Sequence, residues 1–411
     1  MTTDVDRQIE EHRTAQATVT VVEANGRPVK NQEVAVAQRD HQFLFGCAAF
    51  EVLPIANGQM DPEKAETFSK RLLDLCNFVT LPFYWGRFEP ERGKPITEAM
   101  EKAARWCIDH GCETKGHPLC WHTVTAPWLV EMSNEDIIKA QIDRIHRDVG
   151  DFAGLIDTWD VINEVVIMPI FDRYENGITR IAQELGRIGI VRTMFEATRE
   201  ANPDTILLLN DFDTSPAYNI LIEGCLEAGI DIDVIGIQSH MHQGYWGKEK
   251  LLDVLDRFST FGLPIHFTEV TLVSGHIMPS DIVDLNDYQV EEWPTTPEGE
   301  ARQAEQAVEF YKTLYAHPAV EAITWWGLPD GGWLNAPSGL IREDYSPKPA
   351  YEELLSLVKG EWWTDEETYT TDENGRLTFT GYLGDYELVG PDGSATFSLE
   401  KNGAEELEIQ L

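Results

Sequence analysis

Residues 158–164 read TWDVINE, a short apolar and β-branched run that ends on the carboxylate Glu164. Residues 264–269 read PIHFTE and end in the same way on Glu269. Runs of this composition are typical of buried strands in a parallel sheet, where a solvated charge is not expected. When such a sheet closes into a barrel, a carboxylate at the C-terminal end of a strand lies at the mouth that carries the active site.

The pattern around these two runs alternates strand with helix along most of the chain, which predicts an α/β fold of the (β/α)8 or TIM-barrel type. Apolar strand candidates end near Cys47, Thr80, His117, Glu164, Asn210, His240, Glu269 and Gly327. Helical periodicity follows at 62–75, 97–110, 133–149, 177–201, 216–228, 248–261, 297–316 and 348–358. Several of these helices open with capping residues, such as Asp61 before Pro62 and Ser215 before Pro216.

The two ends of the chain do not follow this alternation. Residues 17–39 alternate like strands on either side of the turn sequence ANGRP at 24–28, and residues 361–411 show further strands and turns. Neither piece has enough strands to be stable alone. We therefore predict an accessory β-sandwich built from residues 1–39 and 361–411, and a catalytic barrel at 40–360.

Glu164 and Glu269 on separate strands supply a proton donor and a nucleophile or base, which is the minimal equipment for breaking a glycosidic bond. The alternative is that either residue is a paired structural carboxylate. The residues at the other predicted strand ends favour the catalytic interpretation, because many of them are polar or aromatic.

Several motifs in this chain resemble those of glycoside hydrolase family 10, the β-1,4-xylanases. TWDVINE resembles the W-D-V-V-N-E strand of the family, and the Thr268–Glu269 pair resembles its T-E nucleophile strand. Residues 116–122, GHPLCWH, are similar to G-H-x-L-x-W-H, and residues 238–240 and 326–330 match Q-S-H and W-G-x-x-D. The motifs occur in the family's order over roughly residues 43–358.

The resemblance implies a retaining double-displacement enzyme with Glu164 as acid/base and Glu269 as nucleophile. It implies that His240 orients the nucleophile, although Thr271 stands where the family has an aspartate that supports this histidine. We therefore expect His240 to be neutral, and we expect His242 to lie at the rim. The other residues expected to contact substrate are His117, Trp121, Asn163, Gln238, Trp326, Trp333 and Trp85.

The segment after the second strand departs from the family pattern. Where the family has T-x-E-N-x-M-K-W, residues 80–87 read TLPFYWGR, without the Glu, Asn and Lys that bind sugar on the non-reducing side. Aromatic surface at Trp85, with Arg87 as the one obvious polar replacement, is expected in their place. This change leaves the substrate open, because lost hydrogen bonds to hydroxyls weaken discrimination.

Charge limits the partners. The chain has 71 acidic and 32 basic residues, a formal net charge of −39. Such a field repels nucleic acid and anionic membranes, so neither is expected as a partner. The resemblance implies that the partner is a β-linked polysaccharide or oligosaccharide. A halophilic source is one interpretation of this acidity, and acidity without halophily is the other. No Cys/His cluster suggests a metal, and no cofactor is expected; the six cysteines are expected to be reduced.

The N-terminal residues show no basic segment followed by an apolar core, so a cytoplasmic location is expected, or secretion if a leader has been removed. The main functional hypothesis is cleavage of β-1,4-linked xylan or xylo-oligosaccharides. One alternative keeps the mechanism but acts on another β-linked oligosaccharide or glycoside, and another is a catalytically silent glycan-binding protein. Oligomeric state and endo or exo action are not specified by the sequence.

Overall fold

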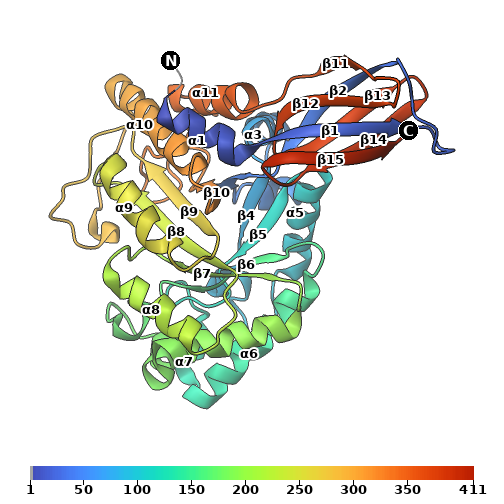
Figure 1. Cartoon of the computed structure of the whole chain (residues 1–411). Helices are drawn as coiled ribbons and strands as arrows, with labels where there is room; N and C mark the ends of the chain where they lie inside the picture. The colour runs from blue at the N-terminus through green and yellow to red at the C-terminus, as the bar shows by residue number, and fades with distance from the viewer. Residues whose placement is uncertain (1–2) are drawn as a thin grey trace. The chain divides into compact units, whose positions relative to one another are not determined.

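Eight parallel strands close into a barrel in the order β10-β3-β4-β5-β6-β7-β8-β9 (Figure 1). The structure, a computed structural model, describes residues 3–411. The barrel strands are β3 (Leu44–Ala48), β4 (Phe78–Pro82), β5 (Glu113–His117), β6 (Thr158–Asn163), β7 (Ile206–Asp211), β8 (Val234–Met241), β9 (Ile265–Leu272) and β10 (Val320–Trp325). The predicted fold class is confirmed, and each strand ends within a few residues of its predicted end.

Helices connect successive strands, as the alternation predicts. The principal ones are α3 (Pro62–Leu75), α5 (Thr97–Asp109), α6 (Asn134–Asp151), α7 (Gly177–Ala201), α8 (Pro216–Glu227), α9 (Gly247–Ser259), α10 (Pro297–Tyr315) and α11 (Pro349–Ser356), with short helices at α2 (Val52–Ala56) and α4 (Trp85–Phe88). The predicted caps form: Asp61 accepts from the backbone N–H of Lys64, and Ser215 accepts from that of Ala217.

A glycine near the end of β5 permits close packing against the neighbouring strand β6. A Cβ on Gly116 would lie 2.1 Å from the indole of Trp159 on the neighbouring β6, so any larger residue would displace this ring. The large, fully buried indole packs against the ring of Phe83, with centroids 4.8 Å apart, and the missing side chain at Gly116 makes room for it. This arrangement fixes β5 against β6, and therefore fixes His117 relative to Glu164.

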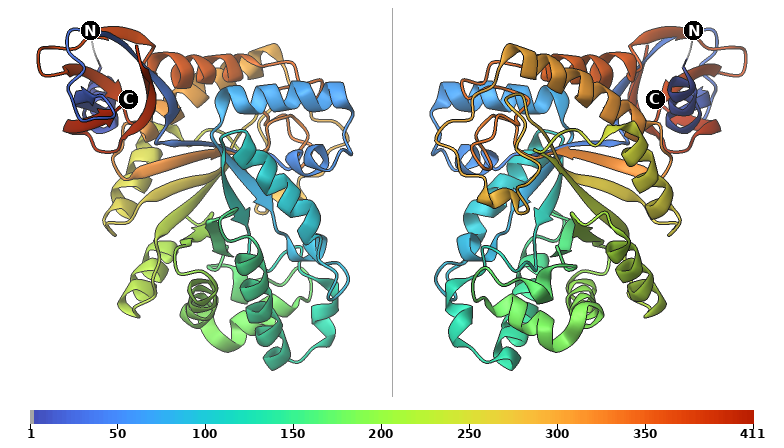
Figure 2. Two further views of the ribbon diagram at one scale, coloured as in Figure 1. Left: turned by 90° about the vertical axis from the view of Figure 1, so that its right-hand side faces the viewer. Right: turned by 90° about the vertical axis from the view of Figure 1, so that its left-hand side faces the viewer.

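The two ends of the chain form one β-sandwich, as predicted. One sheet has the order β12-β1-β15 and the other has the order β11-β2-β13-β14. The strands are β1 (Thr14–Val22), β2 (Glu33–His41), β11 (Glu367–Thr370), β12 (Arg376–Tyr382), β13 (Gly384–Gly390), β14 (Gly393–Leu399) and β15 (Gly403–Gln410). Strands near the N-terminus, drawn in blue, lie among strands near the C-terminus, drawn in red (Figure 2).

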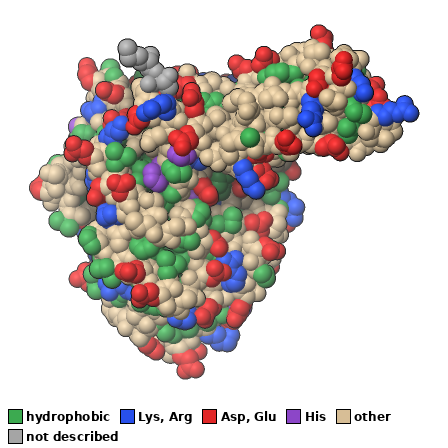
Figure 3. Space-filling model, in the orientation of Figure 1, with side chains coloured by type: hydrophobic (Ala, Val, Ile, Leu, Met, Phe, Trp, Pro, Cys, Tyr) green, Lys and Arg blue, Asp and Glu red, His purple; other side chains and the backbone are tan. Residues whose placement is uncertain are grey.

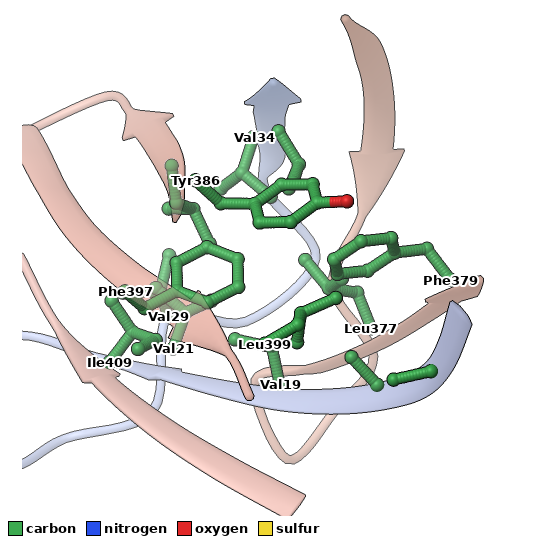
Figure 4. Close-up of a cluster of buried hydrophobic side chains, with 14 of the residues drawn as sticks. Val19, Val21, Val29, Val34, Leu377, Phe379, Tyr386, Phe397, Leu399 and Ile409 are labelled. Carbon is green, nitrogen blue, oxygen red and sulfur yellow. The ribbon is translucent and has the colours of Figure 1, made fainter. Parts of the chain in front are cut away.

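The predicted turn at 24–28 forms, with an antiparallel bridge between Val22 and Pro28, but the flanking strands β1 and β2 belong to different sheets. Both strands alternate apolar residues, and these residues face one shared core that includes Val19, Val34, Tyr386 and Phe397 (Figure 4). The rings of Tyr386 and Phe397 stack with centroids 5.4 Å apart. The sequence analysis also missed α1 (Asp4–Arg13) and β15.

The described residues group into two compact units whose limits differ from the predicted domains. One unit comprises the chain up to Leu44 with Ala304–Glu321 and Pro349–Leu411, and the other comprises Phe45–Gln303 with Ala322–Lys348. Residues 304–321 thus group with the sandwich strands, although we predicted them within the barrel domain. The buried Arg13 guanidinium explains part of this grouping, since it donates to the carbonyl oxygens of Tyr315 and Val320 at 2.7 and 2.6 Å.

Three general properties of the described residues concern surface charge, cysteines and membrane-spanning helices. Acidic side chains are scattered over the face in Figure 3 instead of forming one patch. All six cysteines are buried thiols outside disulfide bonds. Among residues 3–411, no helix is long and apolar enough to cross a membrane.

Candidate active site

The two predicted catalytic carboxylates lie on β9 and directly after β6. Glu164 has a φ of 58°, which is unusual for a non-glycine residue. Its conformation is held by β7, because its backbone N–H donates to the carbonyl of Asn210 at 2.8 Å and that of Val166 donates to the buried carboxylate of Asp211 at 3.0 Å. The neighbouring strand therefore sets the direction in which the Glu164 side chain leaves the barrel.

An amide network joins the two carboxylates. The Nδ2 of Asn210 donates to Oε1 of Glu269 at 3.0 Å and to Oδ1 of Asn163 at 2.8 Å. The Nε2 of Gln238 lies 3.0 Å from the same Asn163 oxygen and 3.3 Å from Oε1 of Glu164. Asn163 and Gln238 are thus brought together with both carboxylates, as their motifs predict.

The orientation of Asn210 is itself fixed. The Thr268 hydroxyl donates to its Oδ1 at 2.7 Å, which leaves both Nδ2 hydrogens for Asn163 and Glu269. A Cβ on Gly236 would lie 2.6 Å from this Oδ1, so a glycine on β8 is needed to make room for the amide. The sequence analysis placed Asn210 at a strand end but did not give it a role in the site.

Glu164 is largely enclosed, with 14% of its side chain exposed, and it has a raised pKa. Burial raises the pKa of Glu164 to about 8, and the negative charges of Glu269 and Asp211 act in the same direction. The indole N–H of Trp121 donates to Oε2 of Glu164 at 2.8 Å, and this bond partly opposes the rise.

Glu269 is more enclosed, with 4% of its surface exposed. Burial raises the pKa of Glu269 to about 7, while nearby His117 and Lys115 oppose the rise. The Nε2 of His240 lies 3.0 Å from Oε2 of Glu269, so the predicted contact between histidine and carboxylate is present. Asn210 and His240 hold one oxygen each, which orients this carboxylate on both sides.

His117 is held by a buried charged pair. Its Nδ1 lies 2.6 Å from Oδ2 of Asp160, and the same oxygen is 2.9 Å from Nζ of Lys115. Burial opposes the charge of Asp160, but Lys115 and His117 outweigh burial and keep the pKa of Asp160 below its ordinary value. Lys115 and Asp160 were missed by the sequence analysis, although both are charged residues inside otherwise buried strands.

Aromatic rings surround His117. The Tyr84 ring lies 5.5 Å from His117 and 5.6 Å from Trp121, and Trp326 lies 5.1 Å from His117 on another side. Phe50 contacts both Tyr84 and Trp326, at 5.9 and 5.7 Å. The exposed Arg87 guanidinium lies 5.6 Å from the Tyr84 ring. Tyr84, which we did not predict, is therefore the residue of the divergent segment that reaches the site.

The prediction that Trp85 forms a sugar-stacking surface is wrong in this structure. Trp85 is 4% exposed, and its indole N–H donates to the carboxylate of Glu89 at 3.1 Å. The Arg144 guanidinium lies 4.9 Å from its ring, and Trp128 packs against it at 5.3 Å. Trp85 begins α4, and the tight turn after β4 directs Tyr84 to the site and Trp85 into the protein.

His242 is also misplaced by the sequence prediction, which put it at the rim. It is fully buried, and the ring of Trp333 packs against it at 5.0 Å. Trp333 lies 4.6 Å from His240 as well, so it covers both histidines. Within residues 3–411, no group of three or more His, Cys, Asp or Glu side chains could hold a metal ion.

Comparison with known proteins shows the family of this chain. The sequence profile of glycosyl hydrolase family 10 matches residues 60–357. The chain belongs to this family. It is 29% identical over 294 residues to endo-1,4-beta-xylanase B of Thermotoga neapolitana, an alignment that covers 67% of this chain and 78% of that protein. Family 10 membership makes the chain a glycoside hydrolase.

A second relative also aligns with the sandwich segments. The anti-sigma-I factor RsgI6 of Acetivibrio thermocellus is 23% identical over 407 residues, which are 97% of this chain and 48% of that protein. The chain therefore spans about half the length of this relative. Among solved structures, xylanase 10B of Thermotoga petrophila in complex with xylobiose superimposes with a TM-score of 0.63 at 24% identity, covering 78% of this chain and 95% of that one.

Proposed function

We propose that this family 10 enzyme cleaves β-1,4-linked xylan or xylo-oligosaccharides by double displacement, with Glu164 as acid/base and Glu269 as nucleophile. The observation that carries the proposal is the amide network through which Asn210, Asn163 and Gln238 join the two carboxylates. Two carboxyl groups held at one site, one of them protonated near neutral pH, match the requirements of glycoside hydrolysis.

In the first step, the protonated Glu164 donates its proton to the glycosidic oxygen while an oxygen of Glu269 bonds to the anomeric carbon. The leaving group departs, and Glu269 becomes a neutral ester. The loss of this charge lowers the pKa of Glu164, because the charge on Glu269 is one of the causes that raise it. In the second step, the Glu164 carboxylate takes a proton from water, whose oxygen attacks the anomeric carbon and releases Glu269.

The other side chains support the positions of the reacting groups. Asn163 is placed to hydrogen-bond a sugar 2-hydroxyl, an interaction that strengthens in the oxocarbenium-like transition state. His117, Trp121 and Trp326 offer a polar edge and apolar faces of the kind that bind pyranose rings. Trp121 also donates to Glu164, so it couples substrate contact to the acid/base.

Cleavage of another β-linked oligosaccharide or glycoside is the second candidate. The observation that favours it is Tyr84, whose ring contacts His117 and Trp121 in the segment where the resemblance predicts polar sugar-binding residues. A panel of aryl β-xyloside, aryl β-xylobioside, aryl β-cellobioside and soluble xylan separates the candidates. Preference for the xylosides supports the first, and preference for the cellobioside supports the second.

Azide rescue tests the roles of the two glutamates, and each variant is the control for the other. Glu269→Ala with azide should release a glycosyl azide of inverted anomeric configuration, because azide takes the nucleophile's place. Glu164→Ala with an activated aryl glycoside and azide should release the retained anomer, because azide attacks the glycosyl-enzyme. Proton NMR of the products distinguishes the anomers, and exchanged outcomes would reverse the assignment.

A further inference from the structure

Thr271 lies two residues after Glu269 on β9, between the partly exposed His240 and the buried His242. Its Oγ1 is 3.5 Å from Nδ1 of His240 and 3.3 Å from Nδ1 of His242. The backbone N–H of Met241 also donates to this oxygen, at 3.1 Å. Thr271 and His242 are fully buried, so these groups must satisfy one another without bulk water.

The proton on His242 can be placed by its surroundings. The Nε2 of His242 has no hydrogen-bond partner among the described residues. An orphaned N–H is rare inside a protein, so the proton of a neutral His242 belongs on Nδ1. From Nδ1 it is donated to the Thr271 hydroxyl oxygen.

The remaining hydrogens follow from this placement. The Thr271 oxygen then accepts from Met241 and from His242, which uses both of its lone pairs. Its single hydrogen is left for Nδ1 of His240, the longest contact of the set at 3.5 Å. A neutral His240 that accepts at Nδ1 carries its own proton on Nε2, and Nε2 is the atom that lies 3.0 Å from Glu269.

We propose that Thr271 is a positioning residue whose hydroxyl, occupied by two donors, holds His240 as a neutral Nε2–H donor to Glu269. The proposal rests on the proposed role of Glu269 as the nucleophile. It assigns a function to His242 as well, which fixes the direction of the Thr271 hydroxyl. An aspartate at position 271, as the family pattern predicts, would instead hold His240 as a cation.

The charges around His240 agree with a neutral ring. Within residues 3–411, Glu269 is the only acidic side chain in contact with His240. His242 lies on one side of the ring, and Trp326 and Trp333, both uncharged, lie on others. Burial lowers the pKa of His240 to about 3. The charges that act on Glu269 from elsewhere in the barrel belong to His117, Asp160 and Lys115.

Three variants at position 271 test the role in catalysis, with an aryl β-xyloside as substrate. Thr271→Val keeps the shape and removes the hydroxyl, and should lower kcat about tenfold with little change in KM. Thr271→Ser should recover most of this loss. Thr271→Asp should move the acidic limb of the kcat/KM profile to lower pH by about one unit, because a cationic His240 stabilises ionised Glu269.

If Thr271 only fills space, Thr271→Val will be as active as the native enzyme, and Thr271→Asp will lose stability without moving the limb. Either result would overturn the proposal.

The resting enzyme gives a test that needs no turnover. In protein labelled with 15N at histidine, long-range 1H–15N spectra should show one protonated nitrogen on each ring, Nε2 on His240 and Nδ1 on His242, at pH 6 to 8. His240→Asn and His242→Asn assign the signals. A doubly protonated His240 in the native protein, or a proton on its Nδ1, would overturn the proposal. Because no substrate is present, this result stands apart from the outcome of azide rescue.

Discussion

The amide of Asn210 donates a hydrogen bond to the carboxylate of Glu269, with Nδ2 and Oε1 3.0 Å apart. The bond lowers the pKa of Glu269 and partly offsets the effect of burial. Because the second Nδ2 hydrogen goes to Asn163, one side chain on β7 sets the positions of a catalytic carboxylate and of a group placed to bind the substrate.

Asn210→Ala should therefore lower kcat/KM by roughly 10- to 100-fold, the scale found when one preorganised donor is removed from an active site. The acidic limb of the profile should move to higher pH, because Glu269 loses a donor that favours its ionised form. Thr268→Val keeps the amide and removes only the hydroxyl that orients it, so its loss should be smaller. Equal losses in both variants would show that Asn210 acts through packing alone.

The barrel could be predicted from the sequence because every strand end carries a local sign of it. Glu164 and Glu269 each follow a short apolar run, and capped helices separate the strand candidates. The sheets of the sandwich could not be predicted in the same way. The turn at Gly26 satisfies the local rules for a hairpin, but a common core holds β1 and β2 in different sheets.

In the site, the sequence predicted the residues that belong to a family motif. It did not predict the residues that hold other site residues in place. Asn210 and Asp160 contact partners on other strands, and no single-sequence pattern records this proximity. Tyr84 and Trp85 show most clearly what the sequence alone does not predict. Both are aromatic residues at a strand end, and the turn after β4 alone determines which of them faces the site.

Raised carboxyl pKa values should make the folded protein less stable as pH increases. The pKa values of Glu164 and Glu269 rise from 4.5 to about 8 and about 7, so the folded state holds these protons where the unfolded state has lost them. Stability contributed by the two groups is complete below about pH 4.5 and is lost as pH rises through 7 to 8. Glu269→Gln, which is neutral at every pH, should remove part of this loss.

At pH 8 the melting temperature of Glu269→Gln should exceed that of the native protein by several degrees, and the difference should close towards pH 5. Differential scanning calorimetry across this range provides the measurement. Glu223→Gln, at an exposed position on α8, should follow the native curve. A difference that stays constant with pH would mean that the substitution acts through packing and not through charge.

The acidic surface predicts that stability depends on salt. With 71 acidic and 32 basic residues, self-repulsion opposes folding at low ionic strength. The screening length falls from about 10 Å at 0.1 M to about 3 Å at 1 M salt, so the melting temperature should rise clearly over this interval. Sodium chloride should act as well as potassium chloride if screening is the cause. A flat or falling curve would leave the acidity without a role in adaptation to salt.

The divergent segment after β4 gives two neighbouring aromatic residues with different expected roles. Trp85→Ala removes a buried indole that contacts Arg144 and Glu89, and it should lower the free energy of unfolding by about 3–5 kcal/mol. Tyr84→Ala removes one of the aromatic rings around His117, and it should lower the free energy of unfolding by less than Trp85→Ala does. Chemical denaturation of the two variants measures this difference.

Activity separates the same two residues by substrate length. Because Tyr84 contacts His117 and Trp121, Tyr84→Ala should raise KM and change the ratio of kcat/KM between aryl β-xylobioside and aryl β-xyloside. Trp85→Ala should leave this ratio unchanged, since its ring faces the protein and affects both substrates equally. A changed ratio in Trp85→Ala, with a native ratio in Tyr84→Ala, would return the sugar-binding role to Trp85 and make Tyr84 a packing residue.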